Sequence, residues 1–294
     1  MKITLLREPW RPHPLAWIHR GEARAIAGEL RRAGHEVNVL RYRADSIPYL
    51  PAEMLLLRLS DPVMLAAAQA LTSARRSFIG PSAEVMARCY DKYQAHRLAA
   101  ANSVDSPPTS LADAAGSMAF PLMLKPRRGS DSLGVRLLRG GPIPARFRTE
   151  AYIAQEYIHG TELTVAVLHG RVGVPLQIHL PEGTPYSFWR KYLLRPPRAP
   201  LADIGVAARV RDAARRIAEV FGVNWAARID LIHEQDSGRL RFLECDVAPL
   251  VGARSAFAAS LEAAGIERAE RLRLLLEGCS NRSSRSTAAL RSTE

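Results

Sequence analysis

The sequence predicts an α/β protein in which a small parallel α/β domain is followed by a central α+β domain and a domain built on an antiparallel sheet. Strand and helix patterns alternate over residues 1–81, as in βαβ units. Strand patterns joined by a glycine-containing loop follow in residues 120–158, and a hairpin pattern fills residues 227–249. The expected domains therefore span residues 1–81, 82–158 and 159–279.

The N-terminal domain is expected to contain four parallel strands. Apolar runs predict strands at residues 2–6, 37–40, 54–59 and 77–79, and apolar stripes predict helices at 21–32 and 62–74. A segment rich in Pro, Trp and His, residues 8–19, is expected to be a loop. Ligands bind beyond the carboxyl ends of parallel strands, so the strand tips of this domain are expected to face a ligand.

The central domain is expected to begin with one helix at residues 83–100, which Pro107 and Pro108 then separate from the strands. A strand at 120–125, a loop of Gly and Ser at 127–135 and a strand at 151–158 follow. Such a loop lets backbone N–H groups close over phosphates. A glycine-containing hairpin without function has the same pattern, so the loop alone does not decide between the two.

The C-terminal domain is expected to start with a strand at 162–168 and an irregular, proline-rich segment at 181–200. An amphipathic helix at 207–221 precedes the hairpin, and helices at 255–264 and 268–276 follow it. The tail, residues 280–294, is rich in Ser, Arg and Thr and is expected to be disordered.

The hairpin around residues 236–238 carries a group of charged side chains. If its turn centres on Ser237, Asp230 lies opposite Glu244 and Arg228 lies opposite Asp246. Side chains of a strand alternate with period two, so all four share one face. Three apolar residues are expected on the same face: Ile232, Leu240 and Phe242.

Three carboxylates held this close require a cation, because like charges directly opposite each other are destabilising and buried unpaired charge is costly. Magnesium fits best, since it prefers oxygen ligands and shares them with substrate phosphates; manganese is the alternative. An ordinary salt-bridged strand pair, in which Arg228 alone neutralises the acids, would have the same sequence pattern.

The net charge of +12 comes from basic residues spread evenly along the chain, without a recognition motif for nucleic acid. An acidic small molecule or a carrier partner is therefore favoured over nucleic acid, an arginine-rich background would give the same composition, and a homodimer stays open. No apolar run could span a membrane, and three scattered cysteines suit neither a disulfide framework nor a zinc site. A cytoplasmic protein is expected. Only four of the 41 basic residues are lysines, at positions 2, 92, 125 and 191.

Several motifs occur in a fixed order: Lys92, Lys125, the loop 130–134, Glu162 and the hairpin carboxylates. This order resembles the ATP-grasp superfamily over residues 1–278. The segment 156–165 (Glu-Tyr-Ile-His-Gly-Thr-Glu-Leu-Thr-Val) and the hairpin strands resemble D-alanine–D-alanine ligase. The stretch from residue 79 to residue 109 looks more like the ligases that add amino acids to ribosomal-protein or carrier-protein carboxylates.

The resemblance implies how ATP would be bound. Lys92, Lys125 and Lys191 would contact its phosphates, and the loop with Ser130, Ser132 and Gly134 would cover them. The positions that match the binding site for adenine and ribose are Gln155, Glu156, Tyr157, Ile158 and Glu162.

The resemblance also implies the residues for catalysis, metal and substrate. Arg228, together with Lys125 and Lys191, would stabilise the reacting groups. Two magnesium ions would be ligated by Asp230, Glu244 and Asp246. The carboxylate of the second substrate would be held by Arg254 and Ser255.

The function implied is that of an ATP-dependent carboxylate–amine ligase, which joins an amino acid, small peptide or specialised metabolite through an acyl-phosphate, intramolecular ring closure included. A kinase of the same superfamily and a non-catalytic nucleotide-binding module are the alternatives. Three positions depart from the family pattern: Asp246 replaces Asn, Gln155 replaces an acid and Leu250 replaces glycine. The N-terminal domain also lacks a Gly-Gly-x-Ser-x-Glu stretch, which argues against synthesis of the cell-wall D-alanine dipeptide.

Overall fold

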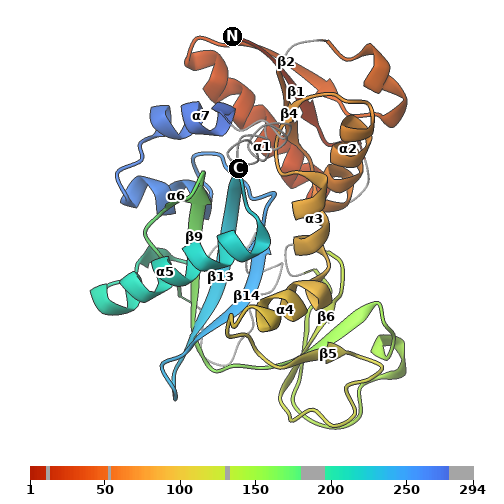
Figure 1. The fold of residues 1–294 in the computed structure, drawn as a ribbon, viewed down its shortest axis with the longest axis vertical. Coiled ribbons are helices and arrows are strands. Elements are labelled where there is room, and N and C mark those ends of the chain that lie inside the picture. Colours follow the sequence, from red (N-terminus) through yellow and green to blue (C-terminus); the bar gives the residue numbers. More distant parts are fainter. Residues whose placement is uncertain (11–13, 52–53, 130–132, 180–195, 278–294) are drawn as a thin grey trace, which may run out of the picture.

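The computed structural model describes residues 1–10, 14–51, 54–129, 133–179 and 196–277, and its strands form three sheets (Figure 1). The first has the strand order β2-β1-β3-β4, and the second has the order β5-β8-β6-β7. The third has six strands, in the order β12-β11-β9-β13-β14, with β10 paired to β9. The first sheet is parallel and the third is antiparallel, as the sequence predicted, and the central sheet is antiparallel as well.

The N-terminal sheet follows the expected βαβ alternation. Its elements are β1 (Lys2–Arg7), α1 (Pro14–Arg32), β2 (Glu36–Arg41), the 3₁₀ helix η1 (Ala44–Tyr49), β3 (Met54–Arg58), α2 (Asp61–Ser73) and β4 (Phe78–Ile79). Helix α1 begins at Pro14, within the segment predicted to be a loop. Proline suits the first turn of a helix, because its φ is already helical and its missing N–H would have no partner there.

The helix predicted at residues 83–100 is two helices, α3 (Ala83–Tyr90) and α4 (Lys92–Ala101). Asp91 interrupts them with φ −89° and ψ 98°, and its carboxylate caps α4 by accepting the N–H of Gln94 at 3.2 Å. Arg127 and Arg128 pair with the same carboxylate at 2.9 and 3.2 Å. The break places Lys92 at the start of α4, facing the loop that follows β6.

The central sheet contains β5 (Thr109–Leu111), β6 (Leu122–Pro126), β7 (Arg136–Leu138), the 3₁₀ helix η2 (Ala145–Phe147) and β8 (Tyr152–Glu156). Helices α3 and α4 contribute Val85, Met86, Ala95 and Ala99 to a core that also contains residues of the third sheet. Helices α3 and α4 are therefore packed onto the C-terminal sheet, whereas the central sheet has a core of its own that includes Leu122, Leu124 and Ala154.

The third sheet is the largest, and it carries the hairpin. Its elements are β9 (Gly160–Leu168), β10 (Arg171–Val172), β11 (Leu176–Ile178), β12 (Arg198–Pro200), α5 (Ile204–Phe221), β13 (Ala226–Glu234), β14 (Leu240–Asp246), α6 (Ala256–Ala263) and α7 (Arg268–Glu277). Val210, Ala214, Ile217 and Phe221 of α5 are buried in the same core as one face of β9 and β13. The opposite face of the hairpin is left to form the site.

The register of the hairpin confirms half of the prediction. Arg228 pairs with Asp246 and Asp230 pairs with Glu244, as expected. A β-bulge then shifts the register between Asp230 and Leu231, so that Leu231 lies opposite Phe242. Phe242 and Leu240 are therefore on the face of the hairpin that packs against the core, with Leu231, and their predicted places beside the carboxylates were wrong. The extra residue of a bulge reverses the alternation, which no period-two rule anticipates.

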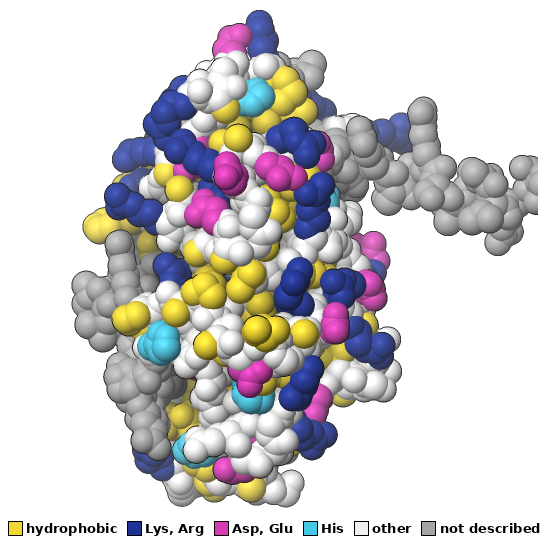
Figure 2. Space-filling model, turned by 90° about the vertical axis from the view of Figure 1, so that its left-hand side faces the viewer, with side chains coloured by type: hydrophobic (Ala, Val, Ile, Leu, Met, Phe, Trp, Pro, Cys, Tyr) yellow, Lys and Arg dark blue, Asp and Glu magenta, His cyan; other side chains and the backbone are white. Residues whose placement is uncertain are grey.

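The surface charge is as dispersed as the sequence indicated. Figure 2 shows Lys and Arg side chains scattered over the visible face and interspersed with acids and apolar groups. Two cysteines, Cys89 and Cys245, are free and buried. Among the helices that the structure describes, none combines the length and apolar character needed to span a bilayer.

Candidate active site

A narrow cleft lies where the central sheet meets the third sheet, and most of the residues predicted to bind ATP line it. Strands β6, β8, β9, β13 and β14, the start of α4 and the loop after β6 form its walls. The lining residues that had been predicted are Lys92, Lys125, Gln155, Glu156, Tyr157, Ile158, Glu162, Asp230 and Glu244. The fold thus collects side chains from positions far apart in the sequence into one cleft.

The two lysines enter this cleft from different elements. The backbone N–H of Lys92 donates to the carbonyl of Arg127 at 2.9 Å, and its ammonium donates to the carbonyl of Gly129. Lys125, in β6, donates from Nζ to Oε1 of Gln155 at 2.6 Å. Both amines are therefore held near the loop that follows β6, where an anion would meet two positive charges.

The environment of Lys125 lowers the pKa of its ammonium group. Loss of solvent lowers the pKa of the ammonium from 10.5 to about 8, and the charge of Lys92 adds to this effect, while Glu244 and Glu162 oppose it. An incoming phosphate would reverse the shift, because a negative charge stabilises the ammonium. Proton uptake is thus expected to accompany anion binding near pH 8.

The loop after β6 needs a glycine at residue 134. Gly134 has a φ of +79°, and a Cβ there would lie 3.0 Å from Cγ of Pro126. The left-handed conformation and the close approach both exclude a larger residue without strain. Ser130 and Ser132 of the same loop, and Lys191, lie outside the described residues, so their predicted roles remain predictions.

The backbone at residues 157–158 lies at the cleft, and one of its N–H groups already has a partner. The N–H of Tyr157 donates to the carbonyl of Pro121 at 2.9 Å, so it is already engaged. Ile158 and Tyr157 both line the cleft. A base in this cleft would therefore meet the carbonyl of Tyr157 or the backbone of Ile158 rather than the N–H of Tyr157.

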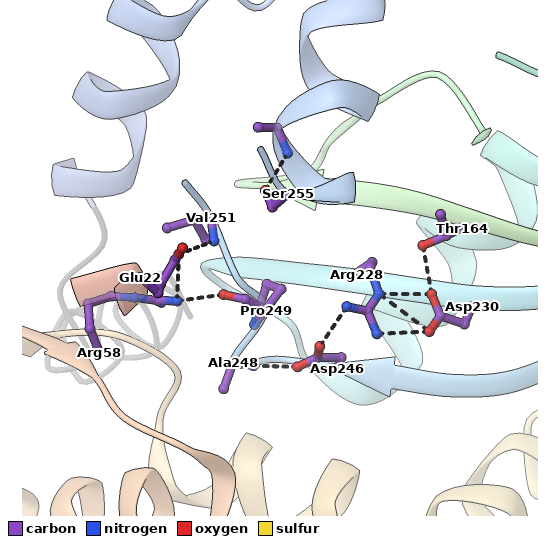
Figure 3. A network of polar contacts seen from close by, with 11 residues as sticks. Glu22, Arg58, Thr164, Arg228, Asp230, Asp246, Ala248, Pro249, Val251 and Ser255 are labelled. Carbon is purple, nitrogen blue, oxygen red and sulfur yellow. Dashed lines mark hydrogen bonds and ion pairs between the residues drawn. The ribbon is translucent and has the colours of Figure 1, made fainter. Parts of the chain in front are cut away.

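The charged residues of the hairpin form a buried network (Figure 3). Arg228 donates from Nε and Nη2 to the two oxygens of Asp230 at 3.0 and 2.9 Å, and Nη1 lies 3.2 Å from Oδ2 of Asp246. Burial alone would lower the pKa of Arg228, but Asp230 and Asp246 together raise it well above the usual value. Thr164 of β9 donates to Oδ1 of Asp230 at 2.7 Å. Arg228 is thus a permanent cation between two carboxylates.

The three predicted metal ligands are not equally placed. Asp246 contacts Arg228 through Oδ2, and Oδ1 accepts the N–H of Ala248 at 3.0 Å. Asp230 and Glu244 line the cleft with both lysines, and Asp246 lines a small adjoining cavity together with Glu244 and Lys92. Within the described ranges, no group of three or more His, Cys, Asp or Glu side chains is arranged to hold a metal ion. Asp230 and Glu244 offer carboxylate oxygens at the cleft, which fit magnesium together with phosphate oxygens.

A second and larger cavity, of about 800 Å³, lies on the other side of Arg228 and Asp230. Helix α1, strands β9 and β13, and the loop after β14 surround it. Both predicted substrate residues, Arg254 and Ser255, line it, as does Leu250. Ser255 also caps α6 by accepting the N–H of Ala258 at 3.0 Å. The two cavities meet at Asp230, which lines both.

Helix α1 supplies a residue to this cavity that the sequence reasoning missed. Glu22 accepts the N–H groups of Val251 and Gly252 at 2.5 and 2.9 Å, and Arg58 at 3.3 Å (Figure 3). Arg58 also donates to the carbonyl of Pro249 at 2.7 Å and is fully buried. The signal was present, because Glu22 and Glu29 lie seven residues apart beside the apolar stripe of α1.

Comparison with known proteins identifies the family. The family model for the D-ala D-ala ligase C-terminus matches residues 92–277, more than half of the chain. The chain belongs to this family. A D-alanine–D-alanine ligase of Nitrosospira multiformis is 28% identical over 206 residues, 64% of this chain and 66% of that protein. One of Gloeobacter violaceus is 28% identical over 91% of this chain and 95% of that protein.

Solved structures of D-alanine–D-alanine ligases share the fold. The enzyme of Bacillus anthracis, crystallised with ATP, has a TM-score of 0.79 at 16% identity and covers 95% of this chain and 97% of its own. The VanG D-Ala:D-Ser ligase of Enterococcus faecalis has a TM-score of 0.75 at 16% identity, with 94% and 98% covered. The predicted ATP-grasp fold is confirmed. Several curated relatives are matched over only about half of their length, as in Pseudomonas putida with 51%.

Proposed function

We propose that this protein is an ATP-dependent ligase that joins the carboxylate of one small, amino-acid-like substrate to the amine of another in a peptide-type bond. The observation that carries the proposal is the joint lining of one cleft by Lys92, Lys125, Glu162 and the carboxylate pair Asp230 and Glu244. Family membership supports the same reaction class. A carboxylate would attack the γ-phosphate of ATP to form an acyl-phosphate and ADP, and an amine would then displace phosphate.

The side chains at the cleft would have separate roles in this reaction. Lys92 and Lys125 would neutralise the triphosphate, and Glu162 would accept hydrogen bonds from the ribose. Arg228 would stabilise the negative charge that develops as the phosphoryl group transfers and as the amine adds, because it lines the larger cavity beside Asp230 and stays charged. Among the described residues that line the two cavities, there is no serine–histidine or cysteine–histidine pair, and this reaction needs none.

Magnesium fits the carboxylate pair. Asp230 and Glu244 lie directly opposite each other in β13 and β14, and both line the cleft, so they would hold the ion with phosphate oxygens as its other ligands. The ion would supply charge neutralisation at the transferring phosphoryl group. Asp246 is engaged by Arg228 and Ala248, so we propose that it sets the position of Arg228 rather than completing a three-carboxylate site.

The larger cavity would receive the amino-acid-like substrates. Its wall combines the guanidinium of Arg254 with apolar groups of Trp17, Ile18 and Leu250. An arginine there suits a substrate carboxylate, and the leucine in place of the family glycine narrows the space beside it. This arrangement supports small substrates with one free carboxylate and a modest apolar side chain.

The test is ADP release by the purified protein with ATP, Mg²⁺ and a panel of D- and L-amino acids, measured with a coupled assay and confirmed by mass spectrometry of the product. Turnover that requires both amino acids supports the ligase. A stable phosphorylated product instead of an amide would establish a kinase, and binding of ATP without turnover across the panel would favour a nucleotide-binding module.

Two substitutions test the residues within this reaction. Lys125→Ala and Glu244→Ala should each abolish turnover, because they remove a phosphate contact and a metal ligand. Lys2→Ala is the matched control, since Lys2 is an exposed lysine at the far end of β1 and should leave turnover unchanged. Full activity of the Lys125 or Glu244 variant would overturn the assignment of the site.

A further inference from the structure

The side-chain amide of Gln155 sits at the centre of a hydrogen-bond network at the floor of the cleft. Oε1 accepts from Nζ of Lys125 at 2.6 Å, and Nε2 lies 2.8 Å from Oγ1 of Thr109 and 2.8 Å from Nε2 of His96. Gln155 is only 1% exposed and His96 only 4%. The amide is therefore surrounded by three fixed partners and has little freedom to rotate.

Two of these partners determine which end of the amide faces them. The ammonium of Lys125 can only donate, so the atom that faces it must be the oxygen of Gln155. The hydroxyl of Thr109 already donates to the carbonyl of Pro107 at 2.8 Å, so it can only accept from Gln155. Both constraints place the oxygen toward Lys125 and the NH₂ group toward Thr109.

The third partner must then be an acceptor as well. Nε2 of His96 faces the NH₂ group of Gln155, so this nitrogen carries no proton and the ring is the neutral tautomer with Nδ1–H. Burial, together with the positive charges of Lys125 and Lys92, lowers the pKa of His96 to about 3, which agrees with a neutral ring. The histidine is thus neutral near pH 7 and accepts from the amide.

We propose that His96 and Thr109 are positioning residues that lock the amide of Gln155, so that the cleft presents a carbonyl oxygen next to Lys125 and selects 6-aminopurine over 6-oxopurine nucleotides. This inference rests on the proposed nucleotide site. A carboxylate has two acceptor oxygens and needs no such lock. A free glutamine can rotate and present its NH₂ group to the oxygen of guanine. A glutamine at this position therefore distinguishes ATP from GTP only if its amide is held in one orientation.

The test compares the affinities of ATP and GTP, measured by isothermal titration calorimetry with Mg²⁺ and no second substrate. The wild type should bind ATP at least about tenfold more tightly than GTP, because GTP would leave two acceptors facing each other. The double variant H96F/T109V removes both acceptors while keeping an aromatic ring beside Phe242, whose ring centroid is 5.4 Å from that of His96. Lys125 alone then orients the amide, and its ammonium would be drawn to the phosphates when a nucleotide binds, so the preference for ATP should fall by about tenfold.

A rescue separates positioning from loss of structure. Adding Gln155→Glu to H96F/T109V should restore the preference for ATP, because a carboxylate offers no NH₂ group in either orientation. Thr109→Ser, which keeps the hydroxyl, should behave as the wild type, and if the double variant does not fold, Thr109→Val alone takes its place. The proposal is overturned if H96F/T109V keeps the preference for ATP, or if adding Q155E does not restore that preference. A wild type that binds neither nucleotide would instead overturn the proposed function.

Discussion

Replacing Arg58 with methionine tests the buried contact between the N-terminal sheet and the loop that follows β14. Arg58 is 1% exposed, and its only carboxylate partner among the described residues is Glu22, at 3.3 Å. Its Nε and Nη1 have no hydrogen-bond partner among the described residues. Burial lowers the pKa of Arg58, although Glu22 and Asp246 oppose this effect. The guanidinium is therefore costly to bury and is compensated chiefly by Glu22.

Methionine retains much of the volume but leaves the Glu22 carboxylate without its cation. Breaking a buried ion pair from one side costs about 3–5 kcal/mol, because one charge stays buried and uncompensated. Glu22 keeps the N–H groups of Val251 and Gly252, so we expect a loss of about 3 kcal/mol in the free energy of unfolding for Arg58→Met. The double variant E22Q/R58M should recover more than half of this loss, since a glutamine oxygen still accepts from both N–H groups.

The assay is urea unfolding followed by circular dichroism and tryptophan fluorescence, with coincident transitions required before free energies are compared. Arg43→Met is the matched control. Its ion pair with Asp45 is exposed, with both side chains 66% accessible, so no measurable change is expected. The reasoning is refuted if Arg58→Met unfolds at the urea concentration of the wild type, or if E22Q/R58M is less stable than Arg58→Met alone.

Three further outcomes are expected. Affinity for ATP should fall as the pH rises through about 8, because Lys125 of the free protein loses its proton there. Calorimetry in buffers of different ionisation enthalpy should detect proton uptake when ATP binds. Lys125→Arg should weaken the dependence of ATP affinity on pH. Gly160→Ala should lower the melting temperature, because a Cβ would lie 2.2 Å from the carbonyl oxygen of His233, whereas Gly116→Ala, with open space around it, should not. Arg228→Lys should reduce turnover by about 10²–10³-fold with little change in ATP affinity, and equal turnover would contradict its role.

The acidic hairpin shows which side-chain pairings a local sequence pattern can predict and which it cannot. The turn residues 236–238 and the alternation of the flanking strands predicted that Asp230 faces Glu244 and that Arg228 faces Asp246, and both pairs are present. The same rule misplaced Phe242, because the bulge beside Leu231 reverses the alternation. A bulge is favoured here by burial of Phe242 against helices from elsewhere in the chain, and no local pattern records that contact.

The helix break at Asp91 was missed for a similar reason. An aspartate within a helical pattern is ordinarily a solvated residue, and residues 83–100 predicted one helix. Arg127 and Arg128, more than 30 residues away, pair with its carboxylate and stabilise the break. Hydrogen bonds from Arg127 and the N–H of Gln94 hold the pKa of Asp91 below its usual value, although burial alone would raise it. A distant ion pair thus determined where Lys92 lies.

The sequence by itself determined the βαβ alternation of residues 1–81, the pairing of Asp230 with Glu244 and of Arg228 with Asp246, and the resemblance to the ATP-grasp superfamily, because these depend on periodicity and on motifs that are contiguous along the chain. Only the tertiary structure decided which residues of distant segments meet. Glu22 of the first helix holds the loop after the last strand, Arg127 and Arg128 pair with Asp91 at the helix break, and His96 of α4 meets Gln155 of β8. Each of these contacts depends on segments far apart in the chain being packed within hydrogen-bond distance, and separation along the chain gives no measure of that distance.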